Sequence, residues 1–104
     1  RLLDAGVPVA VATDHNPTNP IVSLQFAAQL SCYAMGLTPA QALTAVTWNA
    51  AEALDVERHV GGLQVGKVAN LVIHDVPTLE RWIYDLGRNT ATHVILNGKL
   101  VPRV

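Results

Sequence analysis

The chain has 104 residues, of which 50% are apolar and 14% are charged. This is the composition of a folded unit of small-domain size and not of a disordered tail. The formal net charge of -1 excludes the basic surface that nucleic acids or anionic lipids require. The one cysteine, Cys32, cannot form an intrachain disulfide, and no targeting or membrane-spanning segment is evident, so we expect a cytoplasmic protein.

The most informative stretch is an apolar run at residues 7–13 that ends in Asp14, His15, Asn16 and a proline. Apolar residues at consecutive positions are typical of a strand buried on both faces of a parallel sheet. In sheets and barrels of that kind the chemistry lies where the strands end. Asp14, the first ionisable group after the run, is therefore the leading candidate for a working residue. An alternative stays open, because Asp and Asn-Pro are also ordinary turn formers.

A first helix is predicted over residues 23–35. Ser23 can accept hydrogen bonds as its N-cap, and Gly36 suits the left-handed position after its last turn. Its apolar residues cover more than one face, so we expect protein on most of its sides. Cys32 is interpreted as a packing residue, since no nearby cation or helix N-terminus would activate its thiol.

Two further helices are predicted. Residues 38–41 (TPAQ) form a capping box with proline at the first helical position. The helix that follows carries an inner stripe of Ala42, Leu43 and Val46. Thr47 is expected to cap a third, short helix that runs to residue 54.

Short β-like runs follow at residues 71–73 and 94–96. After the second run, Asn97-Gly98 predicts a tight hairpin, because both turn positions need positive φ.

Between these runs, residues 78–86 are amphipathic enough for a short helix with Trp82 and Leu86 pointing inward. The chain is thus predicted to have two parts. Residues 1–57 form a βαα unit, and residues 58–104 form a small β-rich unit with one helix.

Neither part holds an obvious complete core. Residues 1–6 resemble the last turn of a helix closing on glycine, and the run at residues 7–13 has no parallel neighbour in the sequence. We therefore expect the chain to be a fragment from the C-terminal end of a larger protein.

The common catalytic motifs are absent from the sequence. The four histidines, His15, His59, His74 and His93, are widely spaced and form no HxH, HExxH or similar metal motif. No GxSxG elbow, phosphate loop or carboxylate pair occurs either. The residues alone therefore provide one suggestive acid and no partner for it.

The sequence resembles the C-terminal portion of the metal-dependent amidohydrolase superfamily. The match rests on ATD at 12–14, TWNAAEAL at 47–54, GLQVGKVANLVI at 62–73 and the closing VILNGKLV at 94–101. Two further pieces are similar to the imidazolonepropionases of histidine degradation, namely TDHNP at 13–17 and YDLGRN at 84–89.

The resemblance implies an α/β fold, a metal-containing (β/α)8 barrel with a small β-sandwich built from both chain termini. On this template residues 7–13 are the last barrel strand, and residues 23–54 contain the helices that follow it. Residues 62–104 are the C-terminal share of the sandwich. The missing partners of both parts are then explained.

The resemblance also assigns roles around one loop. Asp14 is expected to close the barrel, contact the metal and take a proton from the attacking water. Asn16 is expected to contact a substrate carboxylate, with Thr18 and Asn19 as further substrate contacts. The family usually has Gly-Ser at these last two positions, which leaves the exact substrate open. Two other departures, Asn70 for Asp and Asp85 for His, are expected to affect local hydrogen bonds only.

The implied reaction opens 4-imidazolone-5-propanoate to N-formimidoyl-L-glutamate with a divalent metal, zinc or iron. The implied partner is a small-molecule substrate, with no nucleic acid and no membrane. The isolated chain is expected to be inactive, and to form homo-oligomers or associate with the missing part of the barrel. Two alternatives stay open: another amidohydrolase, such as a deaminase or a different cyclic amidase, and an inactive, self-associating fragment.

Overall fold

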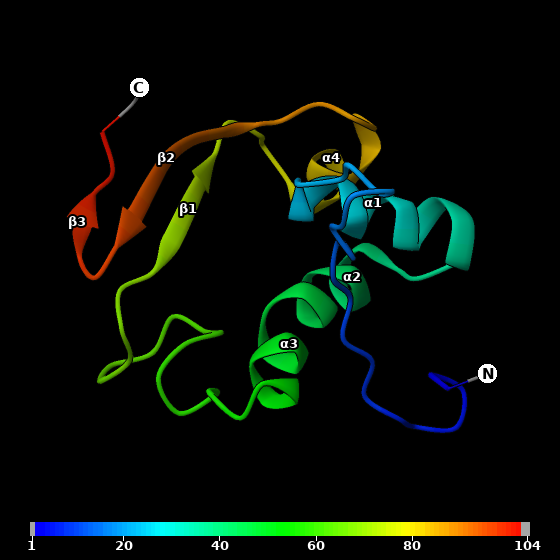
Figure 1. Cartoon of the computed structure of the whole chain (residues 1–104), viewed down its shortest axis with the longest axis horizontal. Coiled ribbons are helices and arrows are strands. Elements are labelled where there is room, and N and C mark those ends of the chain that lie inside the picture. Colours follow the sequence, from blue (N-terminus) through cyan, green and yellow to red (C-terminus); the bar gives the residue numbers. More distant parts are fainter. Residues whose placement is uncertain (1, 103–104) are drawn as a thin grey trace.

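A computed structural model describes residues 2–102 as four helices and a small antiparallel sheet (Figure 1). The elements follow in the order α1 (Leu24–Met35), α2 (Pro39–Val46), α3 (Trp48–Ala53), β1 (Leu71–His74), α4 (Leu79–Tyr84), β2 (Ala91–Leu96) and β3 (Lys99–Leu100). Helices α1, α2 and α4 pack against one another at one side, and the sheet lies at the other (Figure 1). In the described part of the chain, no helix is long and apolar enough to cross a membrane.

Residues 2–7 form the predicted end of a helix. Gly6 has a φ of 75°, its N–H donates to the Leu3 carbonyl at 3.0 Å, and the Val7 N–H donates to the Leu2 carbonyl at 3.0 Å. These two bonds are those of a Schellman motif, which ends helices in a left-handed glycine. The prediction for this turn is confirmed.

The strand predicted over residues 7–13 does not form. The segment is irregular and only partly covered, and no strand pairs with it among residues 2–102. Its backbone is held by two isolated bonds, Val11 N–H to the Ala45 carbonyl at 3.0 Å and Asn49 Nδ2 to the Val9 carbonyl at 3.0 Å. A parallel strand needs a neighbour on at least one side, and the described residues supply none, so the barrel is not closed.

The predicted caps of the first two helices are present. Ser23 Oγ accepts from the Phe26 N–H at 3.2 Å, and Gly36 takes the left-handed conformation at the other end of α1. Thr38 and Gln41 form the reciprocal capping box of α2. These signals are local in sequence, which is why they can be predicted without tertiary information.

Helix α3 also forms, but Thr47 caps it differently from the prediction. The Thr47 hydroxyl donates to the Leu43 carbonyl at 2.7 Å, one turn back in α2, and makes no side-chain cap to α3. A threonine at the end of a helix can bond back to the carbonyl four residues earlier, and here that bond prevails.

The sheet has the strand order β1-β2-β3, antiparallel throughout, and Leu71 lies opposite Ile95. Asn97 and Gly98 have φ values of 52° and 77°, which confirms the predicted hairpin between β2 and β3. The register of the β1–β2 pair shifts between Ile73 and His74. Of the expected β-sandwich, the described residues form this one sheet.

A small core joins the helices. Its buried members come from α1, α2 and α4 and comprise Ala28, Ala42, Val46, Trp82 and Ile83. Cys32 packs against this cluster, as predicted for a packing residue, and burial raises the pKa of its thiol. The core thus contains residues from both sides of the predicted boundary between residues 57 and 58. The division into two parts remains a prediction.

Two glutamines of α1 are buried beside this core, Gln29 completely and Gln25 with 6% of its surface exposed. Gln29 Nε2 donates to the Trp82 and Asp85 carbonyls, both at 3.0 Å, and its Oε1 accepts from the Gly87 N–H at 2.9 Å. The last carbonyls of a helix have no partner within it, and α4 is short. The glutamines therefore stabilise the end of α4 from outside.

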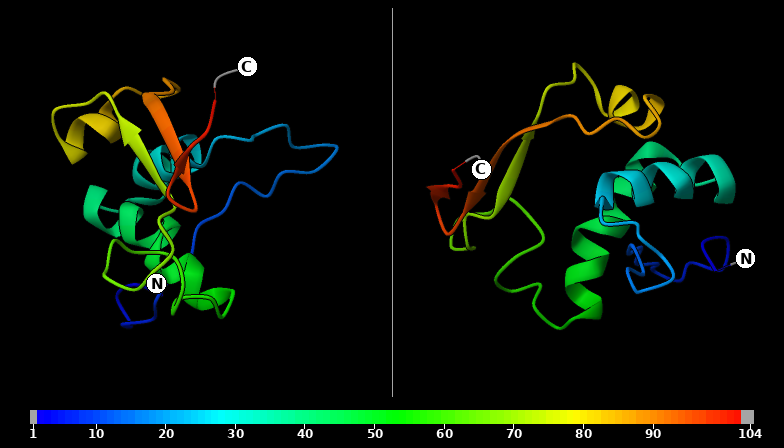
Figure 2. Two further views of the ribbon diagram at one scale, coloured as in Figure 1. Left: turned by 90° about the vertical axis from the view of Figure 1, so that its left-hand side faces the viewer. Right: turned by 45° about the horizontal axis from the view of Figure 1, so that its top comes forward.

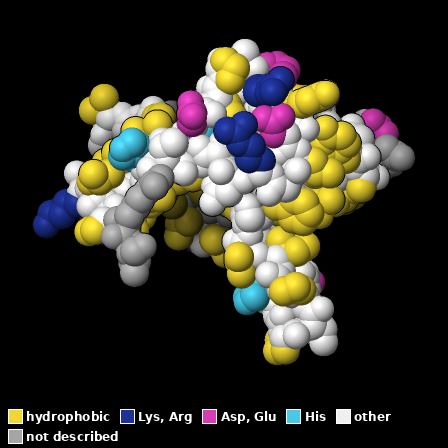
Figure 3. All heavy atoms as spheres, turned by 90° about the horizontal axis from the view of Figure 1, so that it is seen from above, with side chains coloured by type: hydrophobic (Ala, Val, Ile, Leu, Met, Phe, Trp, Pro, Cys, Tyr) yellow, Lys and Arg dark blue, Asp and Glu magenta, His cyan; other side chains and the backbone are white. Residues whose placement is uncertain are grey.

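The inward positions of Leu43 and Leu86 were predicted wrongly, because both side chains are exposed, by 39% and 50%. Other large apolar side chains are exposed as well, and hydrophobic atoms gather over wide areas of the face in Figure 3. Helix α1 is covered on most sides along its middle, as predicted, whereas Leu24 and Met35 at its two ends are exposed. Self-association, or association with other segments, stays a prediction that these surfaces favour.

We predict that Gln29→Ala destabilises the chain by about 2–4 kcal/mol, because the Asp85 carbonyl and the Gly87 N–H lose their partner in a buried place. Chemical unfolding followed by circular dichroism measures this. Gln64→Ala, at an exposed position, is the matched control and should change the free energy of unfolding by less than about 0.5 kcal/mol. Equal effects of the two variants would contradict the assigned role.

Candidate functional site

The loop that carries the predicted site residues extends away from the rest of the molecule (Figure 2, left, blue). At its start Asp14 has a φ of 54°, in the left-handed region that non-glycine residues seldom adopt. Aspartate and asparagine tolerate this region better than other residues. The carboxylate is exposed to solvent.

Two asparagine amides hold the Asp14 backbone in this conformation. Its carbonyl accepts from Asn16 Nδ2 at 2.7 Å and from Asn19 Nδ2 at 3.1 Å. Asn19 Nδ2 also donates to the Thr13 carbonyl at 3.1 Å. The two asparagines are joined by a pair of backbone bonds, 3.0 and 3.1 Å long. The direction of the Asp14 side chain is therefore set by a closed, self-bonded loop.

The structure brings the four predicted site residues together, but it directs most of their polar atoms into the loop. Asn16 Oδ1 accepts from both the N–H and the hydroxyl of Thr18, at 3.0 and 2.7 Å. Asn19 Oδ1 accepts from the Ile21 N–H at 3.1 Å. This is the turn chemistry that the sequence left open as an alternative. The substrate-binding roles of Asn16, Thr18 and Asn19 stay predictions.

The described residues do not provide enough ligands to form a metal centre by themselves. Among residues 2–102, no group of three or more His, Cys, Asp and Glu side chains is placed to hold a metal ion. Asp14 can supply one carboxylate, whereas catalytic metal sites in proteins use several ligands. Any metal centre that includes Asp14 must therefore draw its other ligands from elsewhere.

Asn49 is a residue of this region that sequence reasoning did not single out. It lies in α3, inside the TWNAAEAL stretch, and its amide holds the Val9 carbonyl in the segment that leads to Asp14. The residue was visible only as part of that stretch, because the contact spans 40 positions.

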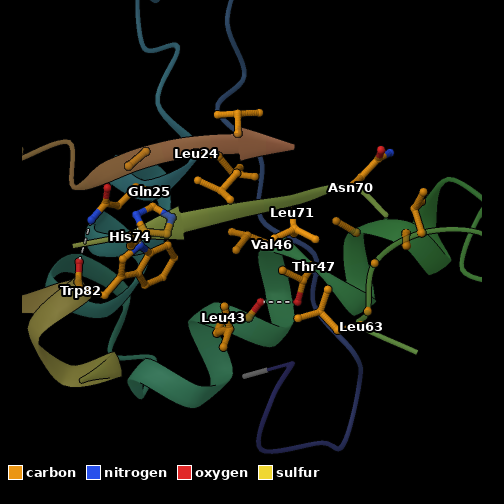
Figure 4. Close-up of a pocket in the computed structure, with 18 of the residues that line it drawn as sticks. Leu24, Gln25, Leu43, Val46, Thr47, Leu63, Asn70, Leu71, His74 and Trp82 are labelled. Carbon is orange, nitrogen blue, oxygen red and sulfur yellow. Dashed lines mark hydrogen bonds between the residues drawn. The ribbon is translucent and has the colours of Figure 1, made fainter. Parts of the chain in front are cut away.

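A cavity of about 990 Å³ lies between the sheet and helices α2 and α3 (Figure 4). Its lining is mainly apolar, and Asp14 does not belong to it. His74 is the one titratable group in that lining, and its ring lies beside the Trp82 indole in Figure 4. The His74 ring is hydrogen-bonded to Thr90 and Trp82.

Residues 1–101 match the model of the Amidohydrolase family. The chain belongs to the amidohydrolase family. Curated relatives named imidazolonepropionase include that of Geobacillus kaustophilus, 51% identical over 97% of the chain, and that of Treponema denticola, 45% identical over 97%. The chain spans about a quarter of the length of these relatives, 24% and 25%.

Two solved structures share this arrangement. An adenosine deaminase from Xanthomonas campestris with bound zinc matches 95% of the chain with a TM-score of 0.83 and 28% identity. An amidohydrolase from Thermotoga maritima matches 99% of the chain with a TM-score of 0.78 and 27% identity. The chain covers 26% and 25% of those two proteins. The helices and sheet therefore correspond to a part of the amidohydrolase fold.

The two departures from the family pattern outside the loop take part in local bonds. Asn70 Oδ1 accepts from the Asn97 N–H at 2.9 Å and so ties the hairpin to the chain before β1. The Asp85 carboxylate pairs with Arg81 and Arg88, each at 3.3 Å. Both findings agree with the prediction that these positions affect local hydrogen bonding.

We predict that Asn19→Ala loosens the loop around Asp14, because the Thr13 and Asp14 carbonyls lose a donor and the Ile21 N–H loses its acceptor. Hydrogen exchange should become faster at the Ile21 amide. Asn89→Ala is the matched control, since Asn89 caps the Ala91 N–H in another turn and should leave Ile21 unchanged. An unchanged Ile21 exchange rate in Asn19→Ala would mean that the amide network does not order the loop.

Proposed function

We propose that the chain is the C-terminal part of a hydrolase that opens a cyclic amide, with 4-imidazolone-5-propanoate as substrate and N-formimidoyl-L-glutamate as product. The observation that carries the proposal is membership of the amidohydrolase family together with 45–51% identity to imidazolonepropionases across almost the whole chain. The structure contributes one feature to it, an exposed carboxylate held at a loop by its own backbone network.

In this reaction the oxygen of water adds to the ring carbonyl carbon, and the bond from that carbon to the ring nitrogen breaks. The carbonyl carbon becomes a carboxylate, and the nitrogen leaves as part of the formimidoyl group. Asp14 is proposed to accept the proton of the attacking water and to pass it to the leaving nitrogen. A divalent metal, zinc or iron, would supply activation of the water when bound.

The two asparagine side chains of the loop have different proposed roles. The Asn19 amide nitrogen donates to the Thr13 and Asp14 carbonyls, so Asn19 is proposed to position the acid in addition to its predicted substrate contact. The Asn16 amide has two N–H bonds and uses one on the Asp14 carbonyl, so the other can donate to a substrate carboxylate. The Thr18 hydroxyl, bonded to Asn16, would fix the rotamer of that amide.

The isolated chain is expected to show no hydrolysis of imidazolonepropionate and weak or no metal binding, because its described residues supply a single candidate ligand. Elemental analysis after dialysis, with an assay that follows loss of the substrate absorbance, measures both. Measurable turnover by the isolated chain would contradict the proposal that it is an incomplete catalyst.

In the full-length protein, Asp14→Asn should lower kcat by about 10²–10⁴-fold, since the amide has the shape of the carboxylate but cannot take the proton. Steady-state kinetics measure the loss. Asp4→Asn, at an exposed position in the first turn, is the matched control and should keep the original rate. A rate within about twofold of the original in Asp14→Asn would remove Asp14 from the mechanism.

The same protein should be assayed with a panel of cyclic amides and with adenosine. The panel matters because Thr18 and Asn19 depart from the family loop and because one structural relative is an adenosine deaminase. Turnover of imidazolonepropionate supports the proposed substrate. Turnover of another member of the panel alone would keep the hydrolase and replace the substrate.

A further inference from the structure

A partly buried polar node joins the sheet to the helices where β1 ends and β2 begins. His74 Nδ1 lies 2.9 Å from Thr90 Oγ1 and 3.3 Å from Trp82 Nε1. Thr90 is buried, with 4% of its surface exposed, and its hydroxyl also contacts the Gln25 amide of α1. The node thus contains groups from β1, α1, α4 and the residue that precedes β2.

The hydrogen-bond chemistry of the node specifies the state of the imidazole. An indole N–H can only donate, so Nδ1 must accept and the ring must be the neutral form with its proton on Nε2. The two rings also meet edge to face, with centroids 5.6 Å apart and an interplanar angle of 78°. A register shift between Ile73 and His74 accompanies this contact, and such irregularities re-aim side chains.

We propose that His74 is a pH-sensitive latch between the sheet and α4, closed when the ring is neutral and opened by a proton on Nδ1. The new Nδ1–H can donate to Thr90 Oγ1, whose own hydrogen turns to Gln25 Oε1, 3.3 Å away. The Trp82 N–H then has no acceptor and faces another N–H. The proton is taken from solvent, and every group except the indole keeps a partner.

No other charged group sets this titration. The node residues Gln25, Trp82 and Thr90 are not ionisable in this range. The nearby charged residues are exposed: Asp75 next to the ring in sequence, Glu80 and Arg81 on α4, and His93 on β2. The Arg81 side chain bonds to Asp85 and the His93 ring to Thr92. The pKa of His74 is lowered, and the cause is burial of the ring.

The sign of the effect on stability follows from that direction. An unfolded histidine has a pKa of about 6.5, and the folded ring has a lower one, so below about pH 6.5 the unfolded chain binds more protons. The free energy of unfolding therefore falls as the pH is lowered from about 6.5 through the pKa of the folded ring.

The test is a titration of the ¹³C,¹⁵N-labelled chain from pH 7.5 downward through the midpoint of His74, observing the indole N–H signals of Trp82 and Trp48. The Trp82 signal should shift and exchange faster with solvent at the midpoint where the His74 ring carbons titrate. The Trp48 signal is the internal control, because its N–H donates to the Glu52 carboxylate and should stay in place over this range. A Trp82 signal that is unchanged while His74 titrates would overturn the proposal.

Two variants separate the latch from general unfolding. His74→Asn keeps an acceptor near the indole and cannot titrate, so the Trp82 transition should be lost, whereas His93→Asn should retain it. Trp82→Phe keeps most of the apolar bulk and removes the N–H, so the pKa of His74 should rise. Persistence of the transition in His74→Asn, or an unchanged His74 pKa in Trp82→Phe, would overturn the proposal even if one variant fails to fold.

Discussion

The structure depends on buried amide side chains that complete the hydrogen bonds of a short helix. Helix α4 has six residues, too few to be stable alone, and its last carbonyls point out of its end. Gln25 and Gln29 of α1 supply the missing donors and accept the Thr90 and Gly87 N–H groups in return. Because these amides are buried, each unsatisfied partner would cost free energy, and the register between the two helices is therefore well specified.

Local signals in the sequence predicted their elements correctly. The caps at Ser23 and Thr38 and the Asn97-Gly98 turn need only neighbouring residues, so no tertiary information is required. Gln25 and Gln29 could not be found in this way. A glutamine in a helix is usually exposed, and their partners lie 53 to 65 positions away. The strand predicted at residues 7–13 does not form for a related reason, because a strand needs a partner strand that is distant in the sequence.

The candidate site was predicted in part. The sequence pattern directed attention to Asp14, and the family resemblance added Asn16, Thr18 and Asn19, which the structure gathers in one loop. The positive φ of Asp14 could not be predicted, because an aspartate adopts it only when the surrounding loop imposes it. The turn interpretation and the site interpretation are thus compatible: the amide bonds that make the turn also aim the acid.

In this loop the carboxylate and the groups that orient its residue belong to different side chains. The carboxylate of Asp14 belongs to one residue, whereas the orientation of that residue is governed by the amides of two others through its carbonyl oxygen. An amide of this loop can therefore be exchanged to change the direction of the Asp14 side chain while the carboxylate itself is retained. A scaffold built in this manner allows the orientation of one side chain to be adjusted in small steps without replacing that side chain.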